Sequence, residues 1–298
     1  QIILQLKPVL EDYKPDIVFV HGDTTTTMAG SLAAFYSGSQ ICHIEAGLRT
    51  FNKRSPFPEE MNRQITSRLT DMHFAPTLSS KHNLLNEGIP EENILITGNT
   101  VIDALIRSIK IVDEKPSNLV LELSRKLSKN EVILVTSHRR ENHGKGIIDI
   151  CEALLEIAKR KPDITIVFPV HLNPKVKLPI NKFLGDISNI LLIEPLAYPD
   201  FIWLMNRSKI IISDSGGVQE EAPSLGKPVL VLRDTTERPE AVEAGTVILV
   251  GTDKKRIVKQ TLNLLNNEIA YTEMSQLHNP YGDGNACEKI VQFLTDDT

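Results

Sequence analysis

Cysteine is scarce in this chain of 298 residues, and its three cysteines, Cys42, Cys151 and Cys287, lie far apart. An odd number at such wide spacing predicts neither a disulfide framework nor a zinc site, and it is typical of proteins from a reducing cytoplasm. No apolar run approaches the about 18 residues that indicate a membrane-spanning helix. We therefore expect a cytoplasmic location and no membrane partner.

Positive charge is not in excess either. The chain has 33 Lys and Arg against 38 Asp and Glu, which gives a formal net charge of −5. Its two basic runs, residues 159–161 and 254–256, are short and fit solvated helix ends, so no nucleic-acid partner is expected. Hydrophobic residues make up 41% and charged residues 24% of the chain, as is usual for a globular protein.

Short apolar runs alternate with segments of helical period along the whole chain. We predict strands at residues 16–20, 40–45, 72–75, 94–96, 132–136, 164–168, 190–193, 210–213, 229–232 and 247–250. Helices are predicted at residues 26–36, 58–68, 79–87, 101–112, 148–160, 254–265 and 286–294. Such alternation indicates parallel sheets with helices on both faces. Residues 113–130 are charged and less cleanly patterned, and are the candidate connection between two Rossmann-like, doubly wound domains.

The most informative segment runs from residue 214 to residue 240. It follows an apolar run at 210–212 that is typical of a buried parallel strand, and Ser215, Gly216 and Gly217 then allow a sharp turn into a helix predicted at 218–225. Free N–H groups at such a turn form a ready anion site. Glu220 and Glu221 are expected in the first helical turn, where they can accept from sugar hydroxyls. A nucleoside diphosphate would fit; an ordinary βα turn is the alternative.

Three carboxylates follow the predicted strands of the first half. Asp23 and Glu45 come at the carboxyl ends of two strands, and Glu59 opens the helix beyond a loop. Ligands of doubly wound sheets bind at that edge, so the three are expected to converge. The alternatives are a helix cap for Asp23 and a favourable first-turn charge for Glu59.

Eight motifs, in order, resemble the non-hydrolysing UDP-N-acetylglucosamine 2-epimerase family, and together they cover essentially the whole chain. They are the segment 214–240 and HGDTTTT (21–27), HIEAGLR (43–49), PFPEEMNR (56–63), TGNTVID (97–103), SHRREN (137–142), PVHLNP (169–174) and HNPYGDG (278–284). The resemblance implies the GT-B architecture, in which two Rossmann-like domains face each other across a cleft.

That architecture gives the expected domain boundaries. Residues 1–118 would form the first domain and 119–284 the UDP-binding domain, with the helix within 285–298 packing back on the first. Members of the family carry a Gly-Thr-Arg-Pro-Glu loop after their first strand, and this motif is not in the sequence. We therefore expect an incomplete first domain that lacks its first strands, in an N-terminally truncated chain.

The family's reaction is the reversible epimerisation at C2 of UDP-N-acetylglucosamine (UDP-GlcNAc) to UDP-N-acetylmannosamine (UDP-ManNAc), which supplies cell-envelope polysaccharide. It proceeds by elimination and re-addition of UDP. No cofactor and no metal are implied, because UDP itself leaves and returns. The resemblance further implies a homodimer, and in some bacterial members a second UDP-GlcNAc as an activator.

The resemblance also assigns roles to residues of this chain. Asp23, Glu45 and Glu59 would be the acid/base groups, and His138 would assist departure of the diphosphate, as would Arg238 in the UDP pocket. Ser215, Gly216 and Gly217 would bind phosphate, Glu221 the ribose, and Phe201 would lie beside the uracil, with plain core packing as its alternative. Arg139, Arg140 and His171 match the activator motifs, and capping of a strand end is the alternative role for His171.

Two other kinds of function stay open, a different reaction on the same fold and binding without catalysis. A relative with the same fold could hydrolyse the substrate and release ManNAc, or transfer the sugar; product analysis separates these from the epimerase, which alone keeps UDP attached. A non-catalytic UDP-sugar-binding module is the alternative from another class, and the missing N-terminal loop favours it.

Overall fold

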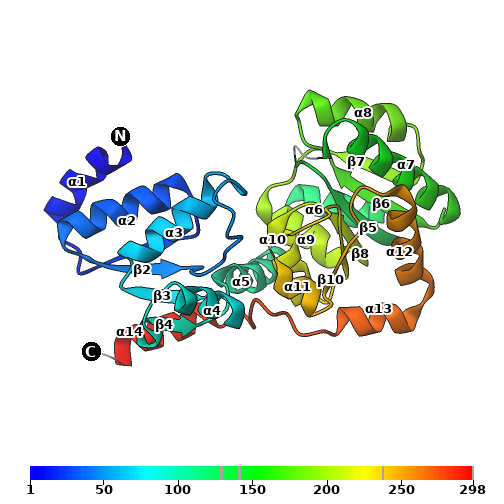
Figure 1. Ribbon diagram of the computed structural model, residues 1–298. Helices are drawn as coiled ribbons and strands as arrows, with labels where there is room; N and C mark the ends of the chain where they lie inside the picture. Colours follow the sequence, from blue (N-terminus) through cyan, green and yellow to red (C-terminus); the bar gives the residue numbers. More distant parts are fainter. Residues whose placement is uncertain (128–129, 140–141, 237, 297–298) are drawn as a thin grey trace. The chain divides into compact units, whose positions relative to one another are not determined.

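The computed structural model describes residues 1–127, 130–139, 142–236 and 238–296 (Figure 1). Contacts divide the chain into two compact units. The first comprises Gln1–Ala104 and Pro280–Thr298, and the second comprises Leu105–Asn279. Among the described residues, no helix combines the length and the apolar character that crossing a membrane requires.

The first unit contains a parallel sheet with the strand order β1-β2-β3-β4, formed by β1 (Ile17–His21), β2 (Gln40–Ile44), β3 (Met72–Ala75) and β4 (Ile94–Ile96). Its other elements are α1 (Ile2–Tyr13), α2 (Thr25–Ser37), α3 (Glu59–Leu69), α4 (Leu78–Asn86), the 3-10 turn η1 (Glu91–Asn93), α5 (Thr100–Glu114), which continues into the second unit, and α14 (Ala286–Asp296). In the register of β1 and β2, His21 pairs with Ile44. Asp23 and Glu45 therefore follow at one edge of the sheet.

Helix α14 packs against this first sheet. Its Ile290 joins the buried cluster around Cys42 and Phe74, and the ring of Phe293 meets Phe74 edge to face at 6.1 Å. Asp103 on α5 caps the helix, since its carboxylate accepts from the backbone N–H groups of residues 286 and 287 at 3.2 and 2.8 Å. Apolar packing and an acidic cap together fix this helix, although Asp103 and Ala286 are 183 positions apart in the sequence.

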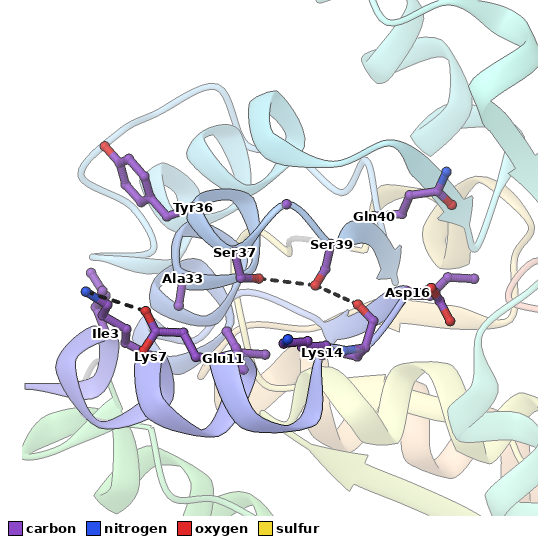
Figure 2. Close-up of a pocket in the computed structure, with 14 residues that line it drawn as sticks. Ile3, Lys7, Glu11, Lys14, Asp16, Ala33, Tyr36, Ser37, Ser39 and Gln40 are labelled. Atoms are coloured by element: carbon purple, nitrogen blue, oxygen red, sulfur yellow. Dashed lines mark hydrogen bonds and ion pairs between the residues drawn. The ribbon is translucent and has the colours of Figure 1, made fainter.

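A groove between α1 and α2 lies at the opposite edge of the same sheet (Figure 2). Lys7, Glu11 and Lys14 line it from α1. The Ser39 hydroxyl donates to the carbonyl of Pro15 at 2.8 Å and closes one side. Because the groove meets the amino ends of β1 and β2, it is separate from the edge that carries Asp23 and Glu45, where ligands of such sheets bind.

The second unit contains a six-stranded parallel sheet with the strand order β10-β9-β8-β5-β6-β7. The strands are β5 (Glu131–Thr136), β6 (Ile164–Pro169), β7 (Ile190–Ile193), β8 (Ile210–Ser213), β9 (Val229–Val231) and β10 (Val247–Leu249). The helices are α6 (Asn118–Leu127), α7 (Lys145–Arg160), α8 (Pro174–Leu184), α9 (Tyr198–Arg207), α10 (Gly216–Glu221), η3 (Ala222–Leu225), α11 (Pro239–Glu243), α12 (Lys254–Asn266) and α13 (Glu268–Ser275). Two parallel-sheet α/β units confirm the predicted fold class. The strand order reverses direction between β5 and β8.

The stretch expected to connect the two domains was interpreted wrongly. Residues 118–127, expected to belong to a charged connection, form the amphipathic helix α6. Its residues Val120, Leu123 and Leu127 are buried at helical spacing, while Glu122 and Lys126 pair at 2.7 Å on the exposed side. The high charge of this segment belongs to the solvent face of a helix.

Candidate functional site

One polar cluster lies in the second unit, at the point where the strand order of the six-stranded sheet reverses. Thr136 at the end of β5 pairs in register with Ser213 at the end of β8, and their hydroxyl groups lie 2.6 Å apart. The segments that follow, starting at Ser137 and Asp214, therefore emerge side by side. Such a switch point is where doubly wound sheets bind ligands.

Asp214 organises this switch point, and its side chain is completely buried. Its carboxylate accepts from the Ser137 hydroxyl, from the backbone N–H groups of His138 and Arg139, and from the Asn142 amide, each at 3.0 Å. Burial raises the pKa of Asp214, but hydrogen bonds from His138, Arg139 and Ser137 outweigh burial and hold the pKa below its usual range. No role was predicted for Asp214 from the sequence, although an aspartate directly after a buried strand is a signal for one.

His138 is oriented by the same carboxylate. Its Nδ1 lies 3.2 Å from Asp214 Oδ1, while 49% of the side chain stays exposed. The ring stacks near that of His171 with centroids 6.5 Å apart, and His171 Nδ1 accepts from the backbone N–H of Asn173 at 3.1 Å. Because Nδ1 of His138 faces a carboxylate, the other ring nitrogen is directed away from Asp214 and can meet a ligand.

A cavity of about 250 Å³ opens beside these two histidines. Its walls include the predicted ligand residues Phe201, Ser215 and Glu221, together with Tyr198 from α9. Phe201 is partly buried on α9, in the wall of the cavity. The structure thus brings three of the six residues proposed to bind UDP into the wall of one cavity, within one unit of the chain.

The helix after the Ser-Gly-Gly turn begins earlier than expected. It starts at Gly216, because Ser215 adopts an extended conformation and serves as the N-cap residue. Glu220 and Glu221 are consequently the last residues of α10, and the prediction that they occupy its first turn was wrong. Their carboxylates contact other side chains, so the dipole at the helix start is not what stabilises them.

Glu221 is buried against Tyr198. The tyrosine hydroxyl donates to Glu221 Oε1 in a short hydrogen bond. Burial raises the pKa of Glu221 to about 7; the bond from Tyr198 opposes this shift and the nearby charge of Glu220 adds to it. A carboxyl group that titrates near neutrality inside a cavity is typical of functional sites.

Glu221→Gln should therefore change how stability depends on pH. A buried carboxyl whose pKa is raised in the folded state binds its proton more tightly there, so wild-type stability falls as pH rises from about 4.5 to about 7. At about 1.4 kcal/mol per pKa unit, the rise in pKa from 4.5 to about 7 corresponds to a loss of roughly 3–4 kcal/mol. The glutamine variant should lack this loss and be the more stable protein at pH 8, with little difference at pH 5, as measured by denaturant unfolding.

The matched control for this prediction is Glu152→Gln, on the surface of α7, where the carboxylate pairs with Lys254 at 3.2 Å. An exposed pair contributes little, so this variant should follow the wild type at both pH values. Equal pH dependence in Glu221→Gln and the wild type would contradict the assignment of the titration to Glu221.

Arg238 is held by Glu220. Its Nε contacts Glu220 Oε1 in a short ion pair, and its backbone N–H donates to the Thr236 hydroxyl at 3.1 Å. Arg139 lies on the other side of the turn, with Nε donating to the Asp214 carbonyl at 3.1 Å and Nη2 3.8 Å from where a Cβ on Gly216 would sit. Arg140 lies outside the described residues.

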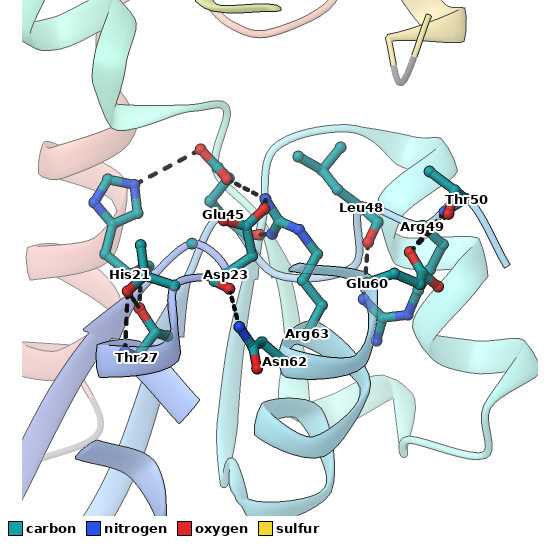
Figure 3. Close-up of polar contacts among 12 residues, drawn as sticks. His21, Asp23, Thr27, Glu45, Leu48, Arg49, Thr50, Glu60, Asn62 and Arg63 are labelled. Carbon is teal, nitrogen blue, oxygen red and sulfur yellow. Dashed lines mark hydrogen bonds and ion pairs between the residues drawn. The ribbon is translucent and has the colours of Figure 1, made fainter. Parts of the chain in front are cut away.

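The second polar cluster belongs to the first unit (Figure 3). Asp23 and Glu45 both contact the guanidinium group of Arg63, with Nη2 lying 2.7 Å from Asp23 Oδ2 and 2.5 Å from Glu45 Oε1. The cap of α2 is Thr24, whose hydroxyl accepts from Thr27 N–H at 3.1 Å, so Asp23 does not take the alternative role of helix cap. Two of the three predicted carboxylates thus converge.

The backbone at Glu45 has a conformation that non-glycine residues rarely adopt, with a φ of +66°. Gly22 faces it, and a Cβ there would lie 3.5 Å from Glu45 Oε1. His21 Nε2 lies 3.8 Å from Glu45 Oε2, and this contact raises the pKa of His21. A left-handed residue held by surrounding contacts at a strand end is a feature that clusters in active sites.

Glu59 does not join this cluster. It is the first residue of α3, and no hydrogen bond or ion pair in the described ranges links it to Asp23 or Glu45. The neighbouring Glu60 is buried and accepts from the backbone N–H groups of Thr50 and Phe51 at 2.9 and 3.1 Å (Figure 3). Glu60 therefore fixes the loop before α3, and a catalytic role for Glu59 stays a prediction.

The fold and these clusters define an α/β protein of two Rossmann-like units, each with polar residues at the carboxyl ends of its parallel strands. The chain belongs to the UDP-N-acetylglucosamine 2-epimerase family, whose model matches residues 1–295. It is 54% identical to UDP-N-acetylglucosamine 2-epimerase of Salmonella typhimurium over 99% of this chain and 79% of that protein. The resemblance found in the sequence is confirmed.

Solved structures of UDP-GlcNAc 2-epimerases are similar to this chain over nearly its whole length. The crystal structure of UDP-GlcNAc 2-epimerase from Neisseria meningitidis bound to UDP-GlcNAc has a TM-score of 0.89 and 54% identity, over 99% of this chain and 80% of that one. The enzyme from Methanocaldococcus jannaschii, in complex with UDP-GlcNAc and UDP, has a TM-score of 0.79 and 38% identity, over 99% and 80% of the two chains.

Proposed function

We propose that this protein catalyses the reversible epimerisation of UDP-GlcNAc to UDP-ManNAc at C2. The observation that carries the proposal is its 54% identity, over nearly the whole chain, to UDP-N-acetylglucosamine 2-epimerases. The paired carboxylates Asp23 and Glu45 supply what the chemistry needs, namely groups that exchange protons beside a bound sugar.

The reaction requires carboxylates for a chemical reason. The C2–H bond has no adjacent carbonyl group, so a side chain cannot remove its proton directly. When UDP leaves C1, the positive charge that develops there acidifies this proton, and a carboxylate takes it to give 2-acetamidoglucal. Proton return to the opposite face and re-addition of UDP complete the inversion. Asp23, Glu45 and Glu59 are our candidates for these two transfers.

The cavity of the second unit suits UDP. We infer that Ser215, Gly216 and Gly217 receive the diphosphate, that Glu221 accepts from the ribose hydroxyls and that Phe201 lies beside the uracil. His138, held by Asp214, and Arg238 would stabilise the negative charge of the departing UDP. The location of Phe201, Ser215 and Glu221 in the walls of one cavity supports this assignment.

Further partners are inferred from the family alone. We infer that the protein forms a homodimer, is located in the cytoplasm and supplies a precursor of cell-envelope polysaccharide. Arg139 and His171 are our candidates for binding a second UDP-GlcNAc as an activator. The proximity of the His138 and His171 rings supports an activator that lies next to the substrate.

Product analysis by NMR tests the proposed function. With UDP-GlcNAc as the only substrate, UDP-ManNAc with its nucleotide still attached should accumulate to equilibrium, and the same mixture should form from UDP-ManNAc. Free ManNAc with UDP would show a hydrolase, and a requirement for an added acceptor would show a glycosyltransferase. UDP binding with no conversion would identify a binding module.

A further inference from the structure

Arg63 lies at the centre of the carboxylate pair but has no role in the function described so far. Its side chain extends from α3 and is 6% exposed. One guanidinium nitrogen, Nη2, contacts both Asp23 and Glu45, at 2.7 and 2.5 Å, and the other, Nη1, donates to the Glu45 carbonyl at 2.8 Å. Arg63 therefore sets the positions of two side chains and of the left-handed backbone at Glu45 (Figure 3).

The charges around the pair explain why a cation is needed. Two carboxylates at neighbouring strand ends repel each other unless a positive charge lies between them. His21 approaches Glu45 at 3.8 Å but titrates, and burial lowers the pKa of His43 to about 3, so that ring is neutral. A guanidinium group stays ionised at every working pH. Arg63 thus supplies the positive charge between the two carboxylates.

The arrangement differs from that of another arginine in the same unit. Arg49 has a fully buried side chain and places Nε and Nη2 on the two oxygens of Glu87, at 2.7 and 3.0 Å. Its fork thus closes on a single carboxylate, as expected of a structural pair. The fork of Arg63 is divided between two carboxylates, so it fixes the distance between them.

We propose that Arg63 is a positioning residue for the epimerisation, one that holds Asp23 and Glu45 in place on either side of one guanidinium nitrogen. This inference rests on the proposed function. After the first proton transfer, the second must take place before the 2-acetamidoglucal and UDP leave the protein. A pair held at fixed separation lets the second transfer occur without a search for the correct geometry.

Arg63→Lys is the variant that tests this role, with Arg49→Lys as the matched control. Lysine keeps the charge but has no planar fork, so it cannot reproduce three contacts from two nitrogens. In Arg63→Lys we expect kcat to fall about 10²-fold, the scale of a misplaced reacting group. The UDP dissociation constant should stay close to that of the wild type. Arg49→Lys should lower Tm but leave kcat per folded molecule unchanged.

The decisive readout is the fraction of turnovers that end as free 2-acetamidoglucal and UDP. This ratio does not depend on how much of the protein is folded, so even a poorly soluble variant, or the alternative Arg63→Gln, reports it. The fraction should rise in Arg63→Lys and stay at the wild-type value in Arg49→Lys. Equal fractions in both variants would overturn the positioning role, whereas a wild type that forms no UDP-ManNAc would overturn the proposed function itself.

Discussion

Asp23→Asn and Glu45→Gln should each lower kcat of the epimerisation by about 10²–10⁴-fold, the usual contribution of a positioned acid or base. Each substitution keeps the shape of the side chain and removes its ability to exchange a proton. UDP affinity should stay near that of the wild type, because the residues proposed to bind the nucleotide belong to the second unit. Steady-state rates and calorimetry with UDP measure the two effects separately.

Glu87→Gln is the control for this pair, since it also removes a carboxylate from an arginine but at the structural contact with Arg49. It should reduce stability and leave kcat per folded molecule unchanged. Glu59→Gln decides whether the third carboxylate takes part, because no hydrogen bond or ion pair among the described residues joins it to Asp23 or Glu45. Near-normal rates in both Asp23→Asn and Glu45→Gln would remove these carboxylates from the mechanism.

Asp214→Ala should destabilise the second unit by about 3–5 kcal/mol, the range for removing one partner from a buried charged network. Four donors from residues 137, 138, 139 and 142 converge on this carboxylate, and the substitution leaves them unpaired in a buried place. UDP binding should weaken as well, since the segment that carries His138 loses its anchor. Denaturant unfolding and UDP calorimetry measure these two losses.

Asp253→Ala provides the comparison. Asp253 is the N-cap of α12, where its side chain accepts from the N–H of Arg256 at 2.7 Å in an exposed position, and its removal should cost about 1 kcal/mol.

The wild type should also lose the stability contributed by Asp214 when the solution becomes acidic. Since its pKa is lowered in the folded state, this contribution is complete above the pKa of the unfolded chain and disappears as pH falls through the lower, folded value. Similar losses in Asp214→Ala and Asp253→Ala would show that Asp214 is no anchor.

The strands could be predicted because parallel strands buried on both faces are short runs of Val, Ile and Leu, such as Ile210–Ser213 and Val229–Val231. The polar residues after them could be predicted to meet, because all strands of a parallel sheet end at one edge. The helix boundary at the Ser215 turn could not be predicted, because the start of α10 depends on the backbone conformation of Ser215 and on its contacts. Helix α6 was missed because its charged residues are as numerous as its three buried ones, and the charge hid the apolar period.

The sequence alone determined the class of fold, the edge of each sheet that carries polar residues, and the family, because these follow from local patterns and from motifs in order. Only the tertiary structure decided that Arg63 contacts both Asp23 and Glu45, and that Asp214 accepts hydrogen bonds from the segment after β5. It also decided that Glu60, and not Glu59, fixes the loop before α3. These contacts link residues that are 9 to 77 positions apart. Hydrogen-bond partners at such sequence separations are set by strand order, register and burial, and they cannot be predicted from a local pattern of the sequence.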